Sequence, residues 1–159
     1  MRMKVAMIGV GCISGIYLEN IFTRYPEIEL VGVCDLIRAR AEAAKEKYPS
    51  LLIYETMEDA LRDPQVEVIL NLTRPAEHFE VSRAALAAGK HVYSEKPLAA
   101  TAELGRQLVA LAEKNGLYLG GAPDTFLGAG FQTARRLIDA GAIGDVMNMQ
   151  LNENEGYWH

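Results

Sequence analysis

A glycine-rich segment near the amino terminus has the residue types that bind phosphate groups. It reads Gly9-Val10-Gly11-Cys12-Ile13-Ser14-Gly15 and follows a strand-like run at residues 4–8. Gly9 allows a tight turn, Gly11 lets the backbone approach a pyrophosphate, and the N-terminus of a following helix offers N–H groups and a positive dipole. Ser14 replaces the third glycine, but serine is small enough for close packing and its hydroxyl can contact a phosphate. We therefore predict a dinucleotide site, with a glycine-rich turn that binds nothing as the alternative.

A carboxylate stands at the end of the second strand-like run, residues 28–34. Asp35 follows Gly9 by 26 residues, a spacing at which an acidic residue accepts both hydroxyls of the adenosine ribose and repels a 2′-phosphate. This predicts NAD as the cofactor. NADP stays possible because Arg38 or Arg40 can pair with a 2′-phosphate. The alternative role for Asp35 is that of an ordinary aspartate at the start of a helix.

An acid, a base and a proline come together in Glu95-Lys96-Pro97, directly after a strand-like run at residues 91–94. Ligands of open α/β sheets bind at the carboxyl ends of the strands. A lysine held there beside a nicotinamide can hydrogen-bond a substrate hydroxyl and help to move its proton while hydride leaves the same carbon. From spacing alone, a surface salt bridge between Glu95 and Lys96 is the alternative.

The elements that must position these residues alternate between strand-like runs and segments of helical periodicity. Strands are expected at residues 4–8, 28–34, 51–54, 68–72, 91–94 and 117–120, with a helix in each interval. This alternation predicts an α/β fold with a mainly parallel sheet.

Local signals predict where several helices begin and end. Thr56 and Asp59 have the spacing of a capping box, and Thr101 can cap a later helix. Gly89, after a helix at 76–88, is suited to a positive φ. The stripes expected to face inward are Val81, Ala84, Ala85 and Ala88 in the 76–88 helix, and Leu104, Leu108, Leu111 and Ala112 in the next.

The last part of the chain predicts a change of domain. A further helix carries Leu127, Phe131, Ala134 and Ile138 on one face, and a strand is expected at 146–151. We therefore divide the chain into a dinucleotide-binding domain, residues 1–122, and residues 123–159, which hold a crossover helix and the first strand of a second domain. That strand would expose an edge that frays or pairs with another copy, so a homo-oligomer is possible.

Composition excludes several other classes of protein. The chain has 159 residues, half of them apolar, which suits a compact domain with its own core. A net charge of −5 without a basic stripe predicts no nucleic-acid partner. The amino-terminal run is too short and interrupted for a signal peptide or a membrane span, so we expect a cytoplasmic protein with no membrane partner. Cys12 and Cys34 have neither disulfide nor metal spacing, so we expect two buried thiols and no metal site.

Taken together, these residues resemble the Gfo/Idh/MocA oxidoreductases, named for glucose-fructose oxidoreductase and inositol dehydrogenase. The resemblance covers the whole chain, and its most specific element is Glu95-Lys96-Pro97 after Gly89-Lys90-His91-Val92. The other matching segments are the glycine-rich loop, Asp35, Asn71-Leu72-Thr73-Arg74-Pro75 with His78, and Ile143-Gly144-Asp145-Val146.

The resemblance implies roles for several residues. Lys96 would be the catalytic residue near the nicotinamide and the substrate, and Glu95 would touch the nicotinamide ribose or carboxamide. Thr73 and Pro75 would line the cofactor, and His78 would shape their loop, unless it only satisfies a backbone group at the start of a helix. The expected cofactor-binding set is Gly9, Gly11, Cys12, Ile13, Ser14, Asp35, Leu72, Thr73, Pro75, His78, Glu95, Lys96 and Pro97. His91, which begins a strand, is expected to be structural, and a cis Lys96–Pro97 bond is a hypothesis because the family's Lys-Pro bond is sometimes cis.

The fold that we expect is a Rossmann-type doubly wound parallel sheet in three layers, with strand order 3-2-1-4-5-6. Members of the family are longer, with a second α/β domain that supplies a catalytic histidine and most substrate contacts, and this domain is absent or only begun here. Residues 122–126 resemble the crossover to it, and residues 156–159 resemble its first part, where His159 is too early to be that histidine.

The resemblance therefore implies the NAD(P)-binding part of a dehydrogenase that transfers hydride between the cofactor and a sugar, polyol or related small hydroxy substrate. The 159-residue chain alone is expected to bind NAD weakly and to turn nothing over. Two alternatives stay open. One is an NAD-binding sensor or partner module without catalysis, and the other is an NAD-dependent glycosidase of the same family.

Overall fold

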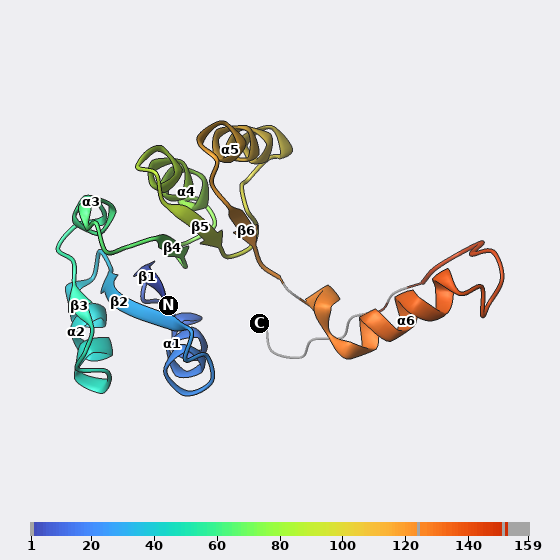
Figure 1. Cartoon of the computed structure of the whole chain (residues 1–159), viewed down its shortest axis with the longest axis horizontal. Helices are drawn as coiled ribbons and strands as arrows, with labels where there is room; N and C mark the ends of the chain where they lie inside the picture. The colour runs from blue at the N-terminus through green and yellow to red at the C-terminus, as the bar shows by residue number, and fades with distance from the viewer. Residues whose placement is uncertain (1, 124, 151, 153–159) are drawn as a thin grey trace. The chain divides into compact units, whose positions relative to one another are not determined.

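The computed structural model describes residues 2–123, 125–150 and 152. The chain forms two units, Met1–Pro123 and Asp124–His159, which are described separately (Figure 1). The expectations for Leu151 and for residues 156–159, including His159, lie outside the described residues, as does Asp124 in the expected crossover segment.

The first unit is built on a sheet of six parallel strands in the order β3-β2-β1-β4-β5-β6. This confirms the expected topology. The strands are β1 (Met3–Ile8), β2 (Ile28–Cys34), β3 (Leu52–Ile53), β4 (Val68–Asn71), β5 (His91–Ser94) and β6 (Leu119–Gly121). The helices are α1 (Ser14–Thr23), α2 (Arg38–Lys47), α3 (Met57–Arg62), α4 (His78–Ala87) and α5 (Ala102–Asn115).

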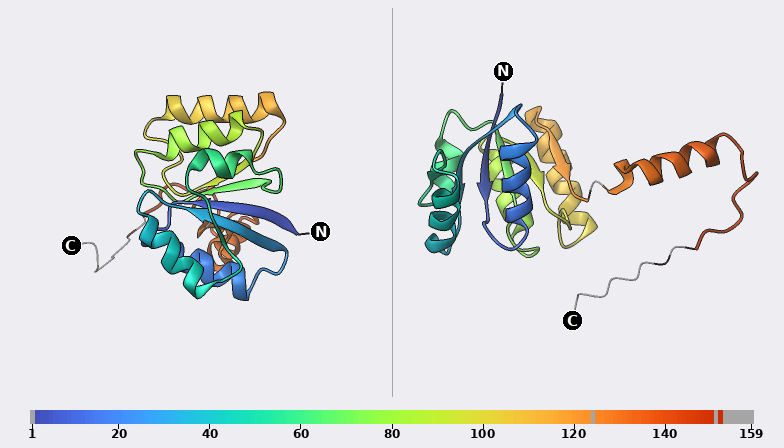
Figure 2. Two further views of the ribbon diagram at one scale, coloured as in Figure 1. Left: turned by 90° about the vertical axis from the view of Figure 1, so that its left-hand side faces the viewer. Right: turned by 90° about the horizontal axis from the view of Figure 1, so that it is seen from below.

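Helices cover both faces of this sheet and make three layers. Figure 2 shows α3, α4 and α5 on one face and α1 and α2 on the other. Successive side chains of β1 point to opposite faces, so Val5 and Met7 pack with the core below α1 and α2, whereas Ala6 and Ile8 pack with the core below α3, α4 and α5. A central strand buried on both sides therefore reads as a continuous apolar run.

The expected helix signals are present at their residues. The Thr56 hydroxyl accepts from the Asp59 N–H while the Asp59 carboxylate accepts from the Thr56 N–H, which completes the capping box of α3. The Leu104 N–H donates to the Thr101 hydroxyl, 3.2 Å away, at the start of α5. Gly89 has a φ of +77° after α4, as its position predicts.

Helix α4 differs from its expected inward stripe. Ala85 is buried and Val81 packs against the core, as expected, but Ala84 is only half-buried and Ala88 is exposed. The other buried residues of α4 are His78, Ser82 and Leu86. Apolar periodicity misplaces the face because two polar side chains are buried there, each with hydrogen-bond partners that the sequence does not reveal.

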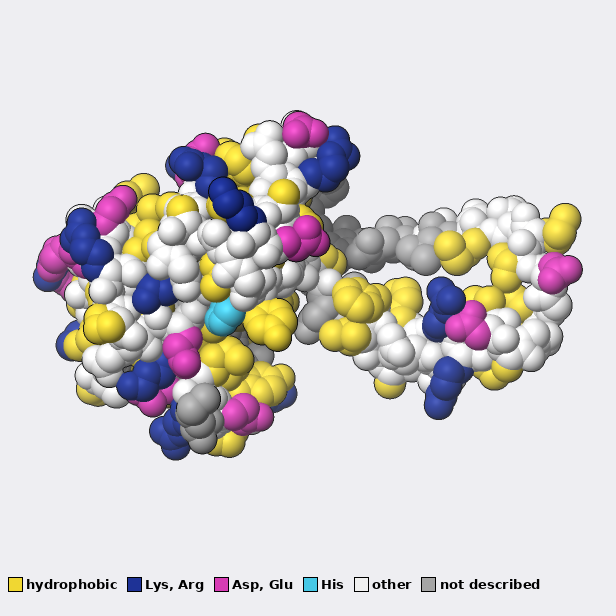
Figure 3. Space-filling view, turned by 45° about the horizontal axis from the view of Figure 1, so that its top comes forward, with side chains coloured by type: hydrophobic (Ala, Val, Ile, Leu, Met, Phe, Trp, Pro, Cys, Tyr) yellow, Lys and Arg dark blue, Asp and Glu magenta, His cyan; other side chains and the backbone are white. Residues whose placement is uncertain are grey.

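The second unit contains a short 3-10 helix, Thr125–Leu127, and α6 (Ala129–Asp139). No strand forms within the described residues 146–150, so the strand expected at 146–151 is wrong over that part. A strand needs a neighbour for its backbone N–H and C=O groups, and none of the described strands pairs with this segment. Large apolar side chains, drawn in yellow in Figure 3, are exposed on this unit, among them Phe131, Leu137 and Ile138 of α6.

No helix in the described part of the chain combines the length and the apolar character that crossing a bilayer requires.

The core beneath α5 gives a test of this packing. Leu108 is fully buried between α5 and the sheet, whereas the next residue, Val109, is 45% exposed. We expect Leu108→Ala to lower the free energy of unfolding by about 2–5 kcal/mol through lost burial and a residual cavity. Val109→Ala should change it by less than about 0.5 kcal/mol. Urea unfolding followed by circular dichroism measures both, and equal losses would contradict the assigned face of α5.

Candidate functional site

Four strand ends bring the predicted segments to one edge of the sheet. In the strand ladders Ile8 pairs with Cys34 and with Asn71, and Asn71 pairs with Ser94. The residues that follow these ends are the glycine-rich loop from Gly9, then Asp35, Leu72 and Glu95. Residues separated by up to 86 positions are thus adjacent at the carboxyl ends of β1, β2, β4 and β5, where open α/β sheets bind ligands.

The first two glycines of the loop serve different purposes. Gly9 has a φ of +95°, and a Cβ built on it would lie 2.6 Å from the carbonyl oxygen of Leu72, so the fold itself requires glycine there. A Cβ built on Gly11 would meet nothing within 4 Å. The space in front of Gly11 is therefore open to a ligand at the edge of the sheet.

The loop carries backbone donors, of which only some have partners within the fold. The N–H groups of Gly9 and Val10 donate to the Cys34 carbonyl and to the Asp35 carboxylate. Within the described residues, the N–H groups of Gly11, Cys12 and Ile13 have no hydrogen-bond partner. Unpaired N–H groups just before the first turn of a helix are the usual ligands of a phosphate, so this loop fits a pyrophosphate.

Ser14, at the third position of the motif, shapes the loop. Its side chain is buried, its hydroxyl donates to the Gly11 carbonyl oxygen at 2.6 Å, and its N–H donates to the same oxygen at 3.2 Å. The small side chain permits close helix packing, as predicted. Because the single hydroxyl proton is used within the loop, a phosphate contact by this group would require that hydrogen bond to be exchanged.

Asp35 ties the end of β2 to the glycine-rich loop. Its side chain is only 6% exposed, and its two oxygens accept from the N–H groups of Val10 and Ile37, both at 2.7 Å. The guanidinium of Arg40 lies 3.7 Å from one of these oxygens. Arg38 is paired with Glu42, at 2.8 Å, and with Glu55. Both arginines that could pair with a 2′-phosphate are therefore already engaged by carboxylates.

A buried polar network lies beneath the loop after β4. The amide of Asn71, which is fully buried, donates to the Ser82 hydroxyl and to the His78 carbonyl oxygen, each at 3.0 Å. Its side-chain oxygen accepts from the Thr73 hydroxyl at 2.7 Å. The sequence did not single out Ser82, because nothing in its spacing separates a buried hydroxyl from an exposed one on a helix.

His78 connects this network to the segment after β5. Its Nδ1 lies 2.6 Å from the carbonyl oxygen of Pro97, and its Nε2 lies 3.0 Å from that of Thr73. The ring is buried, so it lies beneath the loops and not at the open edge. A neutral imidazole has a single N–H, so His78 donates to one of these two carbonyl oxygens while its ring contacts both loops, which unites the two roles considered for it.

The acid and the base of Glu95-Lys96-Pro97 are separated in the structure. The Glu95 carboxylate accepts from the Tyr17 hydroxyl at 2.7 Å and from the Lys96 backbone N–H at 3.0 Å. The Lys96 side chain is exposed, and its ammonium forms no ion pair or hydrogen bond with any residue that the structure describes. The alternative of a Glu95–Lys96 salt bridge is therefore wrong, and the Lys96–Pro97 bond is cis, as hypothesised.

The remaining predicted residues fall into two groups. Cys12, Ile13 and Pro75 are exposed at the edge, and Thr73 is half-buried beside them. Leu72 is buried, so only its backbone can face a ligand. Tyr17 reaches this site through its contact with Glu95, and no signal in the sequence links the two residues.

One expectation about the cysteines is wrong. Cys34 is buried as predicted, and burial, with the neighbouring charge of Asp35, raises the pKa of its thiol. Cys12 is exposed, because it lies on the outer side of the glycine-rich loop and no other segment of the described chain covers it. His91 is structural: its Nδ1 accepts from the Tyr118 N–H, and the two rings lie 5.3 Å apart.

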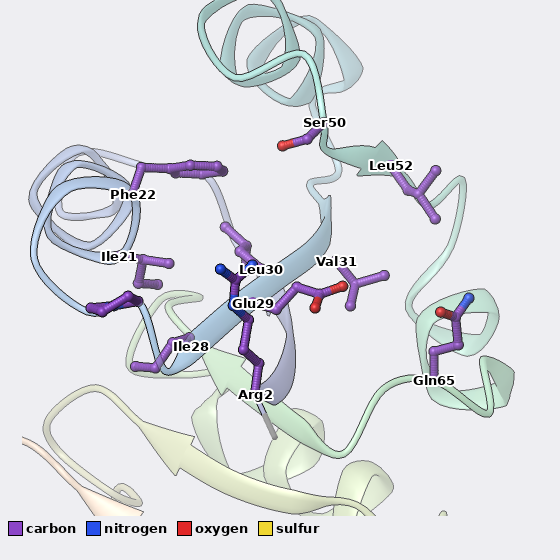
Figure 4. A pocket seen from close by; sticks show the side chains of 11 residues that line it. Arg2, Ile21, Phe22, Ile28, Glu29, Leu30, Val31, Ser50, Leu52 and Gln65 are labelled. Atoms are coloured by element: carbon purple, nitrogen blue, oxygen red, sulfur yellow. The ribbon is translucent and has the colours of Figure 1, made fainter.

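A hollow of about 580 Å³ lies away from this site, at the amino ends of the strands (Figure 4). Ile21 and Phe22 from α1 lie on one side of it and Ser50 and Leu52 on the other, and Leu30 and Arg2 also line it. None of the predicted site residues lines it. In the described part of the chain, no cluster of three or more histidine, cysteine or acidic side chains is arranged to hold a metal ion.

Comparison with known proteins gives relatives along almost the whole chain. Inositol 2-dehydrogenase of Salmonella typhimurium is 32% identical over 151 residues, which cover 92% of this chain and 44% of that protein. The scyllo-inositol 2-dehydrogenase (NADP(+)) of Bacillus subtilis is 28% identical, with 95% of this chain and 41% of that protein covered. The chain thus spans less than half the length of these curated relatives.

Solved structures show the same fold. GenD2 from gentamicin A biosynthesis, solved in complex with NAD, superposes with a TM-score of 0.82 at 27% identity, covering 89% of this chain and 40% of that one. A family model described as "Oxidoreductase family, NAD-binding Rossmann fold" matches residues 3–121. Residues 3–121 therefore form the NAD-binding Rossmann fold of the Gfo/Idh/MocA oxidoreductases, and the chain belongs to this family.

Proposed function

We propose that this chain is the cofactor-binding part of a dehydrogenase that moves hydride between NAD and a sugar, polyol or related hydroxy compound. The observation that carries the proposal is the glycine-rich loop, where open space in front of Gly11 meets three backbone N–H groups without partners in the described chain. The polyol class is supported by the names of the relatives, which are inositol dehydrogenases.

Each part of the cofactor has residues of suitable chemistry at the edge of the sheet. Gly11, Cys12 and Ile13 would donate to the pyrophosphate, and Asp35 would accept from the adenosine ribose. Thr73, Pro75 and Glu95 would face the nicotinamide half. The bound cofactor supplies the hydride acceptor, whereas the protein supplies binding, orientation and proton handling.

Lys96 has the properties of a group that handles a substrate proton. Its ammonium is exposed at the carboxyl end of β5 and is not neutralised by a carboxylate of the described chain. In the direction of oxidation its amine form would accept the proton of the reacting hydroxyl, and in the direction of reduction its ammonium form would return that proton. The Asn71–His78 network would hold the Lys96-Pro97 segment in place through the Pro97 carbonyl.

Residues 123–159 would hold the crossover helix and the start of a second α/β domain, and the exposed apolar side chains of α6 would pack within that domain. The substrate contacts and a partner acid or base would come from that domain. Positioning supplies much of enzymatic catalysis, so the 159-residue chain alone is proposed to bind cofactor without turning substrate over.

Isothermal titration calorimetry of the purified chain with NAD tests this proposal. We expect saturable binding by the wild type and at least a roughly tenfold loss, about 1.4 kcal/mol, for Gly11→Ala, because the new methyl group occupies the space reserved for the pyrophosphate. Its stability should change by no more than about 1 kcal/mol. Gly105→Ala in α5, which also has open space around it, is the matched control and should bind NAD normally. Absence of NAD binding by the wild type would reject the proposed function.

The preference for NAD is expected to depend on Asp35. Removing its carboxylate in Asp35→Ala should weaken NAD by roughly ten- to a hundredfold, the value of a charge-assisted hydrogen bond, and should weaken NADP much less. Asp63→Ala is the control, since Asp63 also accepts from a backbone N–H, that of Gln65, and lies outside the site. Both variants should lose stability, but only the first should change the ratio of NAD to NADP affinity. An equal loss for both cofactors would show that Asp35 supports the glycine-rich loop and does not recognise the ribose.

The two thiols should differ in reactivity. We expect a thiol reagent to modify Cys12 rapidly in the folded chain and Cys34 only after unfolding, because Cys34 is buried and its raised pKa leaves less thiolate. Saturating NAD should slow the fast reaction by covering the loop. Cys12→Ser identifies the fast phase by removing it. Two fast thiols, or a fast phase that NAD does not slow, would contradict the assignment.

A further inference from the structure

The hydroxyl of Tyr17 makes a long-range contact that the cofactor roles above do not explain. Tyr17 lies in the first turn of α1, directly after the glycine-rich loop, and its hydroxyl donates to Glu95 Oε1 at 2.7 Å. Glu95 follows β5, 78 residues further along the chain. One hydrogen bond therefore joins the helix at the pyrophosphate loop to the segment that carries Glu95 and Lys96.

The Glu95 carboxylate is held by one donor on each oxygen. Oε2 accepts from the Lys96 backbone N–H at 3.0 Å, and Oε1 accepts from Tyr17. The backbone of Glu95 is fixed as well, since its N–H donates to the Asn71 carbonyl oxygen at 2.9 Å. Each carboxylate oxygen has a second lone pair, so the group can still accept from a ribose hydroxyl while it is held.

Tyr17 is suited to hold this carboxylate because its ring is anchored. The ring packs against the core below α1 and α2, in the cluster that contains Leu18 and Leu70. A tyrosine has only two side-chain torsions, so a packed ring presents its hydroxyl in a defined direction. Glu95 has three torsions and is half-buried, and without Tyr17 only the N–H of its neighbour would restrain its side chain.

We propose that Tyr17 is a positioning residue for the nicotinamide half of the cofactor and acts through Glu95. This inference rests on the proposed function, in which Glu95 faces the nicotinamide ribose. In this role Tyr17 would not contact the cofactor; it would fix the carboxylate that the nicotinamide ribose meets. Affinity for the nicotinamide half then depends on the tyrosine hydroxyl, whereas affinity for the adenosine and pyrophosphate half does not.

The test compares NAD with ADP, which contains the adenosine ribose and two phosphates but lacks the nicotinamide riboside. Tyr17→Phe keeps the packed ring and removes the donor. We expect calorimetric titration of the 159-residue chain to show a roughly three- to tenfold loss of NAD affinity and unchanged ADP affinity, the effect of one misplaced hydrogen-bond acceptor. Glu95→Gln should give the same pattern, and in that background Tyr17→Phe should add little, because the two residues act as one unit.

Tyr54→Phe is a matched control of the same chemistry. The Tyr54 hydroxyl donates to an Asp63 carboxylate oxygen, also at 2.7 Å, and burial with this hydrogen bond raises the pKa of Tyr54. This pair lies outside the site. Its removal should lower the melting temperature without changing the ratio of NAD to ADP affinity.

The outcomes separate this inference from the proposed function. Equal losses for NAD and ADP in Tyr17→Phe would overturn the inference, because the tyrosine would then only support the loop and α1. Unchanged affinity for both would overturn it as well, as would full additivity with Glu95→Gln. A wild-type chain that binds neither NAD nor ADP would reject the proposed function. If the wild type binds both, and Tyr17→Phe leaves the ratio of NAD to ADP affinity unchanged, only the inference about Tyr17 fails.

Discussion

Backbone hydrogen bonds between β1, β2, β4 and β5 keep four strand ends in step at one edge of the sheet. Because Ile8, Cys34 and Asn71 pair in register, the loops that follow them start at the same level. A slip of one residue in any ladder would turn a following side chain to the opposite face. The arrangement of the glycine-rich loop, Asp35 and Glu95 therefore depends first on backbone pairing and only then on the side chains themselves.

A second layer of side chains holds these loops from below. Asn71, His78 and Ser82 are all buried, and each has hydrogen-bond partners among the loops or the helix above β4. Burying a polar group without a partner is costly, so such a network stabilises one arrangement of the loops over others. The exposed groups of the site, including Lys96, thus lie on segments that are held both by strand pairing and by the buried polar network.

The order of the strands and the helix caps could be predicted from the sequence. The strand order followed from the alternation of elements together with the family resemblance. The caps at Thr56 and Thr101 followed from local chemistry, because each side chain acts within three residues. Long-range pairs could not be predicted, because nothing near Tyr17 indicates Glu95. The polar side of α4 was missed for a related reason, since periodicity counts apolar residues only. The strand expected at 146–151 depended on a neighbour that the described chain does not supply.

The double use of Asp35 has a consequence for engineering cofactor preference. Its carboxylate receives the N–H groups of Val10 and Ile37, so it is part of the loop's framework as well as a candidate for ribose recognition. Replacing it with a neutral or cationic side chain to admit a 2′-phosphate would leave two backbone donors without their acceptor. A redesign for NADP would therefore have to rebuild the turn after β2 together with the charge, and a single substitution would exchange selectivity for a loosened glycine-rich loop.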